Sequence, residues 1–158
     1  MKGITPCLWF DGQAEEAAIF YASLLPDSKV DSVNRAPADF PGGKQGDALV
    51  VEFTLLGRPF QGLNGGPQFP FTEAISLSVS TEDQAETDRL WDALIADGGS
   101  PSRCGWLKDR FGLSWQIVPL PLVKMMSDPD KDAARRATEA MLKMDRLDIA
   151  VAAKAFAG

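Results

Sequence analysis

The sequence predicts an α+β fold in which two fused βαβββ modules form a curved mixed sheet or open barrel, followed by a C-terminal helical extension. Three observations predict it: an internal repeat, the same order of elements after each copy, and a helical pattern at the end. The 158 residues are 45% hydrophobic and 24% charged, which is typical of one globular domain. Within it we expect module one at 1–70, module two at 71–119 and a helical tail at 120–158.

The repeat lies at the start of two predicted helices. The tripeptide QAE at 13–15 recurs at 84–86, and the same offset of 71 residues places Phe20 against Trp91. Apolar residues follow each copy at the spacing of an amphipathic helix, and acidic residues in the first turn suit the positive end of the helix dipole. Each copy therefore predicts a strand, a turn and a helix.

Extended runs follow each predicted helix. In module one we expect strands at 29–35, 48–56 and 59–63, with a loop rich in proline and glycine at 37–46. In module two, Gly98 and Gly99 end the helix. The strands expected after it are 102–107, 108–111 and 113–119.

The tail from Pro119 onwards reads as helical. Asp128 followed by Pro129 predicts an N-cap with proline at the first helical position. Alanine and methionine then recur at helical spacing, and a last helix is expected at 147–156. We expect a helical lid or an arm that packs on a partner subunit.

Composition excludes several classes of function. The chain has no histidine, which excludes His-containing metal triads and Ser-His or Cys-His dyads. A net charge of -6 argues against a nucleic-acid partner, because binding to phosphates needs a basic patch. No apolar run reaches the roughly 18 residues that cross a bilayer, and we see no secretory signal. We therefore expect no membrane partner and a cytoplasmic location, with Cys7 and Cys104 as free thiols.

Six segments carry a family resemblance over most of the chain. They are 4–18 (ITPCLWFDGQAEEAA), 20–28 (FYASLLPDS), 63–66 (LNGG), 73–78 (EAISLS), 104–119 (CGWLKDRFGLSWQIVP) and 139–149 (EAMLKMDRLDI). With the duplicated βαβββ order, they resemble the vicinal oxygen chelate superfamily, which includes glyoxalase I, extradiol dioxygenases and bleomycin-resistance proteins. The residues in these segments are most similar to those of the PhnB-like branch. This resemblance implies a homodimer.

Relatives in that branch carry the label 3-demethylubiquinone-9 3-methyltransferase, so methyl transfer is one alternative. The residues do not favour it. A methyl donor with an adenosyl group usually needs a Gly-rich turn from strand to helix in a doubly wound parallel sheet. Here the glycine pairs at 42–43 and 65–66 precede loops or strands.

The resemblance also locates metal positions. Metal-dependent members of the superfamily place His, Glu or Gln ligands on the first and last strands of each module. In this chain those positions fall near Ile4 and Ala74, within 61–64 and at Gln116. Two are apolar, and a shift of one residue to Glu73 would reverse the face in a strand. We expect no metal and no cofactor, with a metal-dependent glyoxalase or dioxygenase as the alternative.

Amides and tryptophans are the candidate ligand-binding residues. The side chains of Asn64 and Gln116 can both donate and accept, which suits a carbonyl or carboxylate, unless backbone groups satisfy them. Trp9 and Trp106 could wall an apolar pocket, with core packing as the alternative. Strand alternation places Trp115 and Gln116 on opposite faces.

Two further candidates are reactive groups. Cys104 would need Lys108 or Arg103 to lower its pKa before it could act as a nucleophile, and a half-buried inert thiol is the alternative. Glu73 or Glu52 could serve in acid-base chemistry if burial raised the pKa of its carboxyl group.

The first function hypothesis is a protein that binds a small molecule in the concave sheet without a transition metal, its reaction unassigned. We expect the ligand beneath the loop at 37–46, contacted by Asn64 and Gln116. A metal-dependent enzyme, the labelled methyltransferase and a ligand-free dimeric scaffold are the alternatives, and the sequence leaves open whether the chain is an enzyme.

Overall fold

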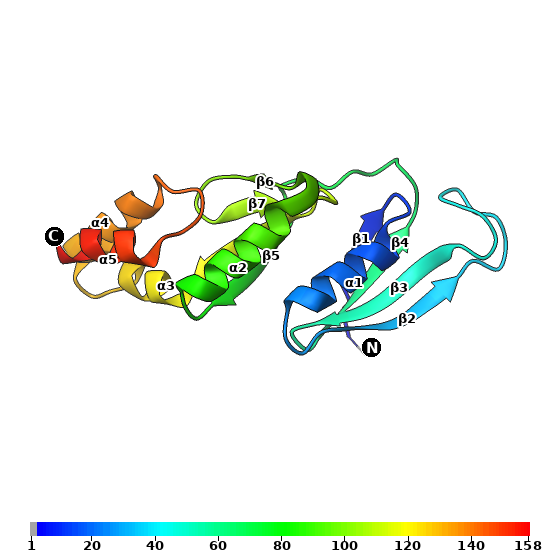
Figure 1. Ribbon diagram of the computed structural model, residues 1–158, viewed down its shortest axis with the longest axis horizontal. Coiled ribbons are helices and arrows are strands. Elements are labelled where there is room, and N and C mark those ends of the chain that lie inside the picture. The colour runs from blue at the N-terminus through cyan, green and yellow to red at the C-terminus, as the bar shows by residue number, and fades with distance from the viewer. Residues whose placement is uncertain (1–2) are drawn as a thin grey trace. The chain divides into compact units, whose positions relative to one another are not determined.

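The computed structural model describes residues 3–158, and the chain divides into a first unit that ends at Phe71 and a second unit that spans Thr72–Gly158. Each unit builds its own four-stranded sheet (Figure 1). The two units are described in turn.

The first unit follows the predicted order of strand, helix and three strands. Its elements are β1 (Cys7–Phe10), α1 (Ala14–Leu24), β2 (Lys29–Arg35), β3 (Ala48–Leu55) and β4 (Arg58–Asn64). The sheet has the order β1-β4-β3-β2, with β1 parallel to β4 and the other pairs antiparallel. These strands confirm the expected extended runs to within one residue at most ends.

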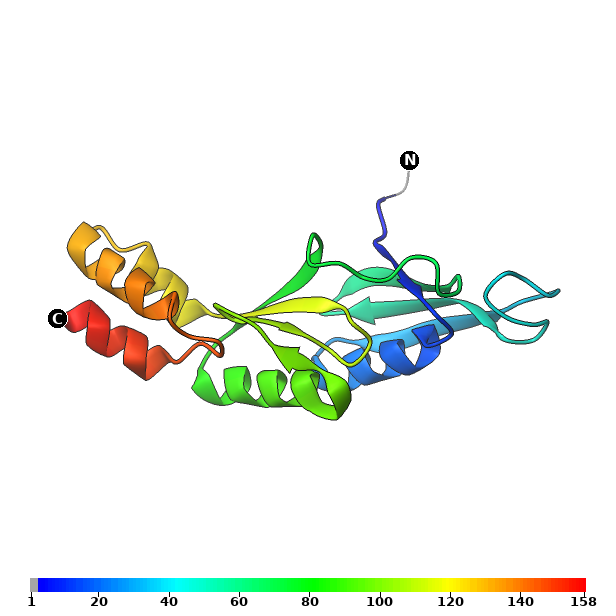
Figure 2. The same cartoon turned by 90° about the horizontal axis from the view of Figure 1, so that it is seen from above.

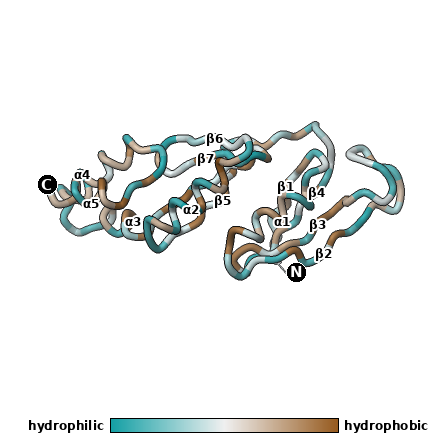
Figure 3. Tube along the Cα trace, viewed as in Figure 1, coloured by the Kyte–Doolittle hydropathy of each residue, from teal (hydrophilic) through white to brown (hydrophobic). Residues whose placement is uncertain are grey.

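Helix α1 covers one face of this sheet. Strand β3 is apolar along most of its length (Figure 3), and alternate side chains from it, at Val51 and Phe53, are buried with Ala17 and Tyr21 of α1. The small residues of α1 let the helix lie close to the strands. The other face of the sheet carries Trp9, Glu52, Gln61 and Leu63, all at least partly exposed.

The second unit repeats this topology. Before the tail, its elements are β5 (Ser76–Thr81), α2 (Gln84–Ile95), the short 3-10 helix η1 (Ala96–Gly98), β6 (Ser100–Pro101), β7 (Trp106–Lys108) and β8 (Ser114–Pro119). The strand order is β5-β8-β7-β6, again with a parallel pair first. The predicted α+β fold of two βαβββ modules is confirmed, and neither sheet closes into a barrel.

Two strand assignments in this unit were wrong. Residues 102–107 do not form one strand, because Cys104 and Gly105 both have positive φ, 59° and 83°, and turn the chain before β7 begins. The expected strand at 108–111 is absent, because Lys108 ends β7 and a turn follows it. In this turn the side chain of Asp109 accepts hydrogen bonds from the backbone N–H groups of Phe111 and Leu113.

Strand β8 separates a buried face from a polar face. Trp115 and Ile117 are buried with Trp91 of α2, so Trp91 belongs to the core. Gln116 lies on the opposite face and is half-buried, which confirms the predicted alternation. We call this opposite face the serine face; it comprises Ser76, Ser78, Ser80, Trp106, Lys108, Ser114, Gln116 and Val118.

Three helices form the tail: α3 (Leu120–Met126), α4 (Lys131–Met141) and α5 (Ile149–Ala157), with α4 and α5 side by side (Figures 1 and 2). Leu122, Leu147 and Ala152 form a small core with four partly buried methionines around it. The N-cap of α4 is Asp130, whose carboxylate accepts from the N–H groups of Asp132 and Ala133. The predicted N-cap at Asp128 was therefore wrong by two residues.

Hydrogen bonds of Gln84 and of two backbone N–H groups, together with ion pairs of Arg146 with Asp88 and Asp92 of α2, join the tail to the sheet part of the second unit. The amide of Gln84 donates to the carbonyl of Leu147 at 3.0 Å and accepts from the N–H of Ile149 at 2.8 Å. The N–H groups of Cys104 and Gly105 donate to the carbonyls at positions 144 and 145. No helix within residues 3–158 combines the length and apolar character needed to span a membrane.

Candidate functional site

An apolar pocket of about 280 Å³ lies in the first unit, where the loop at 37–46 meets the end of β4. Its apolar lining consists of Trp9, Phe40, Pro41, Leu49, Leu63 and Phe69. The sequence predicted a ligand beneath this loop in contact with Asn64 and Gln116, and an apolar pocket walled by Trp9 and Trp106. Asn64 and Trp9 line this pocket, whereas Gln116 and Trp106 belong to the second unit. Two further aromatic rings, those of Phe40 and Phe69, also line the pocket.

The indole of Trp9 is held in one orientation. Its Nε1 donates a 2.7 Å hydrogen bond to the carbonyl of Gly66, and its ring meets the ring of Phe69 edge-on, with centroids 4.9 Å apart. A Cβ at position 65 would lie only 2.2 Å from the indole ring. Glycine at position 65 therefore allows Trp9 to lie flat against the backbone that follows β4.

The loop at 37–46 is also fixed in place. A Cβ at Gly42 would lie 2.6 Å from the carbonyl oxygen of Asn64. Only glycine at position 42 therefore allows the loop backbone to lie this close to the end of β4. Phe40 and Gly43 exchange two backbone hydrogen bonds, and the carboxylates of Asp39 and Asp47 accept from loop amides. The wall of the pocket is therefore largely formed before a ligand arrives.

Asn64 joins three segments at this pocket. It is 3% exposed, its Oδ1 accepts from the N–H of Ala14 at 2.9 Å, and its Nδ2 donates to the carbonyl of Ala48 at 2.8 Å. The first bond satisfies an amide at the start of α1 that has no partner within the helix. Its amide group thus serves the backbone, as in the structural alternative, and the residue also forms part of the pocket wall.

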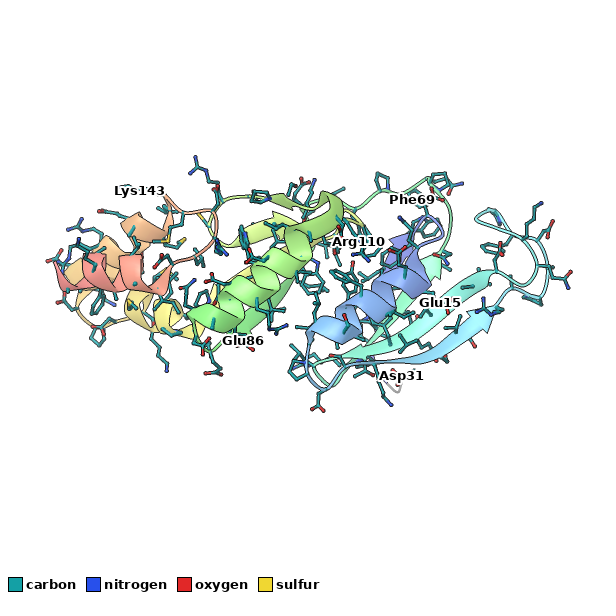
Figure 4. The ribbon with its side chains drawn as sticks, in the orientation of Figure 1. Glu15, Asp31, Phe69, Glu86, Arg110 and Lys143 are labelled. Carbon is teal, nitrogen blue, oxygen red and sulfur yellow. The ribbon has the colours of Figure 1, made fainter. Side chains whose placement is uncertain are left out.

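A second, polar pocket of about 220 Å³ shares Phe40, Gly42 and Asn64 with the apolar one. Its charged residues include Glu15, labelled in Figure 4, and Arg35, whose Nη2 lies 3.6 Å from the carboxylate of Glu15. The loop at 37–46 therefore has an apolar pocket on one side and a charged pocket on the other.

The other four predicted residues belong to the second unit. Trp106 and Gln116 are paired across β7 and β8 on the serine face, and Gln116 donates from Nε2 to Ser76 Oγ at 2.9 Å. Glu73 lies in the turn before β5 and forms an ion pair with Lys108. The hydrogen bond from Lys108, followed by the N–H of Glu73 itself and the charge of Lys108, lowers the pKa of this carboxyl group.

Cys104 does not lie on the serine face. It occupies the turn before β7, is half-buried, and is held there by the bond from its N–H to the carbonyl of Met144. Glu73 is in a turn rather than a strand, so strand alternation does not govern which way its side chain points.

The residues present do not fit a transition metal. Ile4 is 94% exposed and precedes β1, and Ala74 lies in the turn before β5, so neither position offers a ligand. Gln61 and Gln116 offer neutral amides, which are weak ligands for such ions. Within residues 3–158, no three side chains of His, Cys, Asp or Glu gather as a group that could hold a metal.

Sequence reasoning missed Phe40, Phe69 and Lys108. The two phenylalanines each precede a proline in a turn-rich segment, a signal that marks an aromatic ring on a fixed loop. Lys108 was considered only as a neighbour of Cys104. Its pairing with Glu73 depends on the turn before β5, which no periodicity reveals.

Comparisons with known proteins agree on one family. A family model described as 3-demethylubiquinone-9 3-methyltransferase matches residues 2–118, ending just before α3. A PhnB protein from Bacillus cereus, whose name carries the same methyltransferase description, has 35% sequence identity and a TM-score of 0.67, covering 75% of this chain and 99% of that one. A protein from Pseudomonas aeruginosa is 22% identical, with a TM-score of 0.61 and coverage of 75% and 98%. Comparison with curated proteins gave no match.

Proposed function

The chain belongs to the 3-demethylubiquinone-9 3-methyltransferase family, which is also the description of the similar PhnB protein, and on that premise we propose that its first unit binds a small, flat, apolar molecule without a transition metal. The site is the pocket between the loop at 37–46 and the end of β4. We assign no reaction to it.

The observation that carries this proposal is the aromatic lining of a pocket with fixed walls. Trp9 and Phe69 present ring faces and edges, which favour stacked or edge-on contact with another ring. Ligand pockets usually have volumes of roughly 300–1,000 Å³, so a volume of about 280 Å³ suits a molecule of one or two rings. Fixed walls reduce the entropy lost on binding.

Methyl transfer is not part of the proposal. Each described sheet contains one parallel pair and two antiparallel pairs, with no βαβαβ alternation, so the sheet lacks the turn that commonly holds an adenosyl methyl donor. The homodimer and the cytoplasmic location expected from the sequence stay predictions.

The test uses the four indole N–H signals in a ¹⁵N correlation spectrum. We would titrate the protein with neutral bicyclic aromatics such as 2-naphthol, having assigned each signal with Trp→Phe variants. We expect the Trp9 signal to move and the signal of the core residue Trp91 to stay. Gly65→Ala should weaken binding about tenfold or more, because its Cβ would displace the indole, whereas the loop control Gln45→Ala should not.

Two results would count against the pocket. If none of the neutral bicyclic aromatics moves the Trp9 signal, the site does not bind this class of molecule. If Gly65→Ala folds and binds the probe as the parent protein does, the ligand lies elsewhere.

A further inference from the structure

The serine face of the second unit carries a row of polar side chains that the first proposal does not use. Ser114 on β8 pairs with Ser76 on β5 to one side and with Lys108 on β7 to the other. Two residues along the same face, Gln116 pairs with Trp106. Hydroxyl, ammonium and amide donors therefore lie beside one aromatic ring.

Ser114 is the unusual member of this row. It is 1% exposed, and its Oγ has no hydrogen-bond partner among the described residues. Buried hydroxyl groups in folded proteins are nearly always hydrogen-bonded, because an unsatisfied one lowers the stability of the fold. A hydroxyl kept buried and unsatisfied next to a lysine suggests that a ligand supplies its partner.

Lys108 already holds a carboxylate, that of Glu73. The side chain of Glu73 is 66% exposed and that of Lys108 is 40% exposed, so this ion pair lies at the surface. Surface ion pairs contribute little free energy and exchange readily. A carboxylate from solution can therefore replace Glu73 on Lys108 at small cost.

We propose that the serine face binds the carboxylate of a small aromatic acid, which takes the place of Glu73 on Lys108. The carboxylate accepts from the ammonium of Lys108 and from the hydroxyl of Ser114, and the second N–H of the Gln116 amide is a further donor. The ring of the acid lies against the indole of Trp106. This site uses none of the residues that line the apolar pocket of the first unit, and it goes beyond the function proposed for that pocket.

The chemistry at each position fits an anion with two oxygens. A carboxylate can accept about four hydrogen bonds, and bonds from a charged donor are the strongest of these. Trp106 is half-buried, so part of its ring is available for contact. Glu73 acts as a built-in competitor that keeps Lys108 paired when no ligand is bound.

The experiment compares 2-naphthoate with its neutral isostere 2-naphthamide, following the Trp106 indole signal. We expect the acid to bind and the amide to bind about tenfold more weakly or worse. Lys108→Met should weaken binding of the acid by a similar factor, whereas Glu73→Gln should strengthen it severalfold because the competing carboxylate is gone. Opposite changes in affinity at the two paired residues, a loss at Lys108 and a gain at Glu73, are expected only if the ligand's carboxylate replaces that of Glu73 on Lys108.

Ser114→Ala provides a second, independent test. It removes a buried hydroxyl without a partner, so it should raise the melting temperature while weakening binding of 2-naphthoate. Ser80→Ala, an exposed serine on the same face, is the matched control and should change neither.

The proposal is overturned if 2-naphthoate does not bind at millimolar concentration, if acid and amide bind equally, or if Glu73→Gln leaves the affinity unchanged. Movement of the Trp9 signal instead of the Trp106 signal would place the acid in the first unit's pocket and also overturn it. Failure of 2-naphthol at Trp9 bears only on the first proposal, so the two are tested separately.

Discussion

The carboxylate of Asp109 accepts a 2.8 Å hydrogen bond from the indole Nε1 of Trp115, and both side chains are 2% exposed. The other carboxylate oxygen of Asp109 accepts from two backbone amides in the turn between β7 and β8. One buried side chain thus fixes the turn and the position of Trp115 on the helix-covered face. It thereby places Gln116 on the serine face.

Asp109→Ala is expected to lower the free energy of unfolding by about 3 kcal/mol, because a buried indole N–H and two turn amides lose their acceptor. Urea denaturation measures this. Asp145→Ala, at an exposed carboxylate, is the control and should stay within about 0.5 kcal/mol. A loss below about 1 kcal/mol for Asp109→Ala would contradict a structural role for this bond.

Asn64→Ala should lower the free energy of unfolding by about 1–3 kcal/mol, because the N–H of Ala14 and the carbonyl of Ala48 lose their side-chain partner. Asn34→Ala, on an exposed strand position, serves as the control. If the two variants were equally stable in urea, the bonds of Asn64 to the backbone would be unimportant for folding. Asn64 could then be assigned to ligand contact alone.

Gln84→Ala should loosen the attachment of α5 to α2 within the second unit. The N–H of Ile149 then loses its acceptor, so hydrogen exchange should speed up at the start of α5. Gln13→Ala is a matched control, because Gln13 occupies the equivalent position in the repeat and its side chain forms no capping bond to α1. Equal exchange at Ile149 in both variants would show that other contacts hold the tail.

The pH dependence of stability should reveal the ion pair between Glu73 and Lys108. The pKa of Glu73 in the folded protein lies below its ordinary value of 4.5. The pair therefore adds stability that is fully present above that value and is lost as the pH falls through the lowered pKa.

The measurement is the melting temperature of the parent protein and of Glu73→Gln between about pH 7 and about pH 2. The parent should be slightly more stable near neutrality, and the difference should disappear at the acidic end. In a Lys108→Met background the same substitution should have little effect at any pH. Because Asp31 and Asp39 have lowered pKa values too, the variant comparison is needed to isolate Glu73.

Sequence periodicity was enough to predict most of the fold. The repeated QAE segment and the alternation of apolar residues correctly gave both helices, the strands of the first unit and the opposite faces of Trp115 and Gln116. The strand error at 102–107 arose at Cys104, whose positive φ is unusual for any residue but glycine and asparagine and carries no signal in residue type. The N-cap error arose because both Asp128 and Asp130 are acceptable caps.

The candidate site was harder to predict. Asn64 lines the pocket at the loop, but Gln116, the other contact expected there, belongs to the second unit. The pairing of Asn64 with Ala14 and Ala48 depends on distances between segments far apart in the chain. The same holds for the contact of Trp9 with Phe69 and for the ion pair of Glu73. Residue type shows what a side chain can donate or accept, and only its neighbours show what it does.

The sequence by itself determined the two-module architecture and the absence of imidazole chemistry, because apolar periodicity and residue counts are properties of the chain alone. Tertiary structure decided which amides serve the backbone, which tryptophan lines a pocket, and that the Ser114 hydroxyl is buried without a hydrogen-bond partner among residues 3–158. These depend on close packing between strands and loops, where a shift of about 1 Å makes or breaks a hydrogen bond.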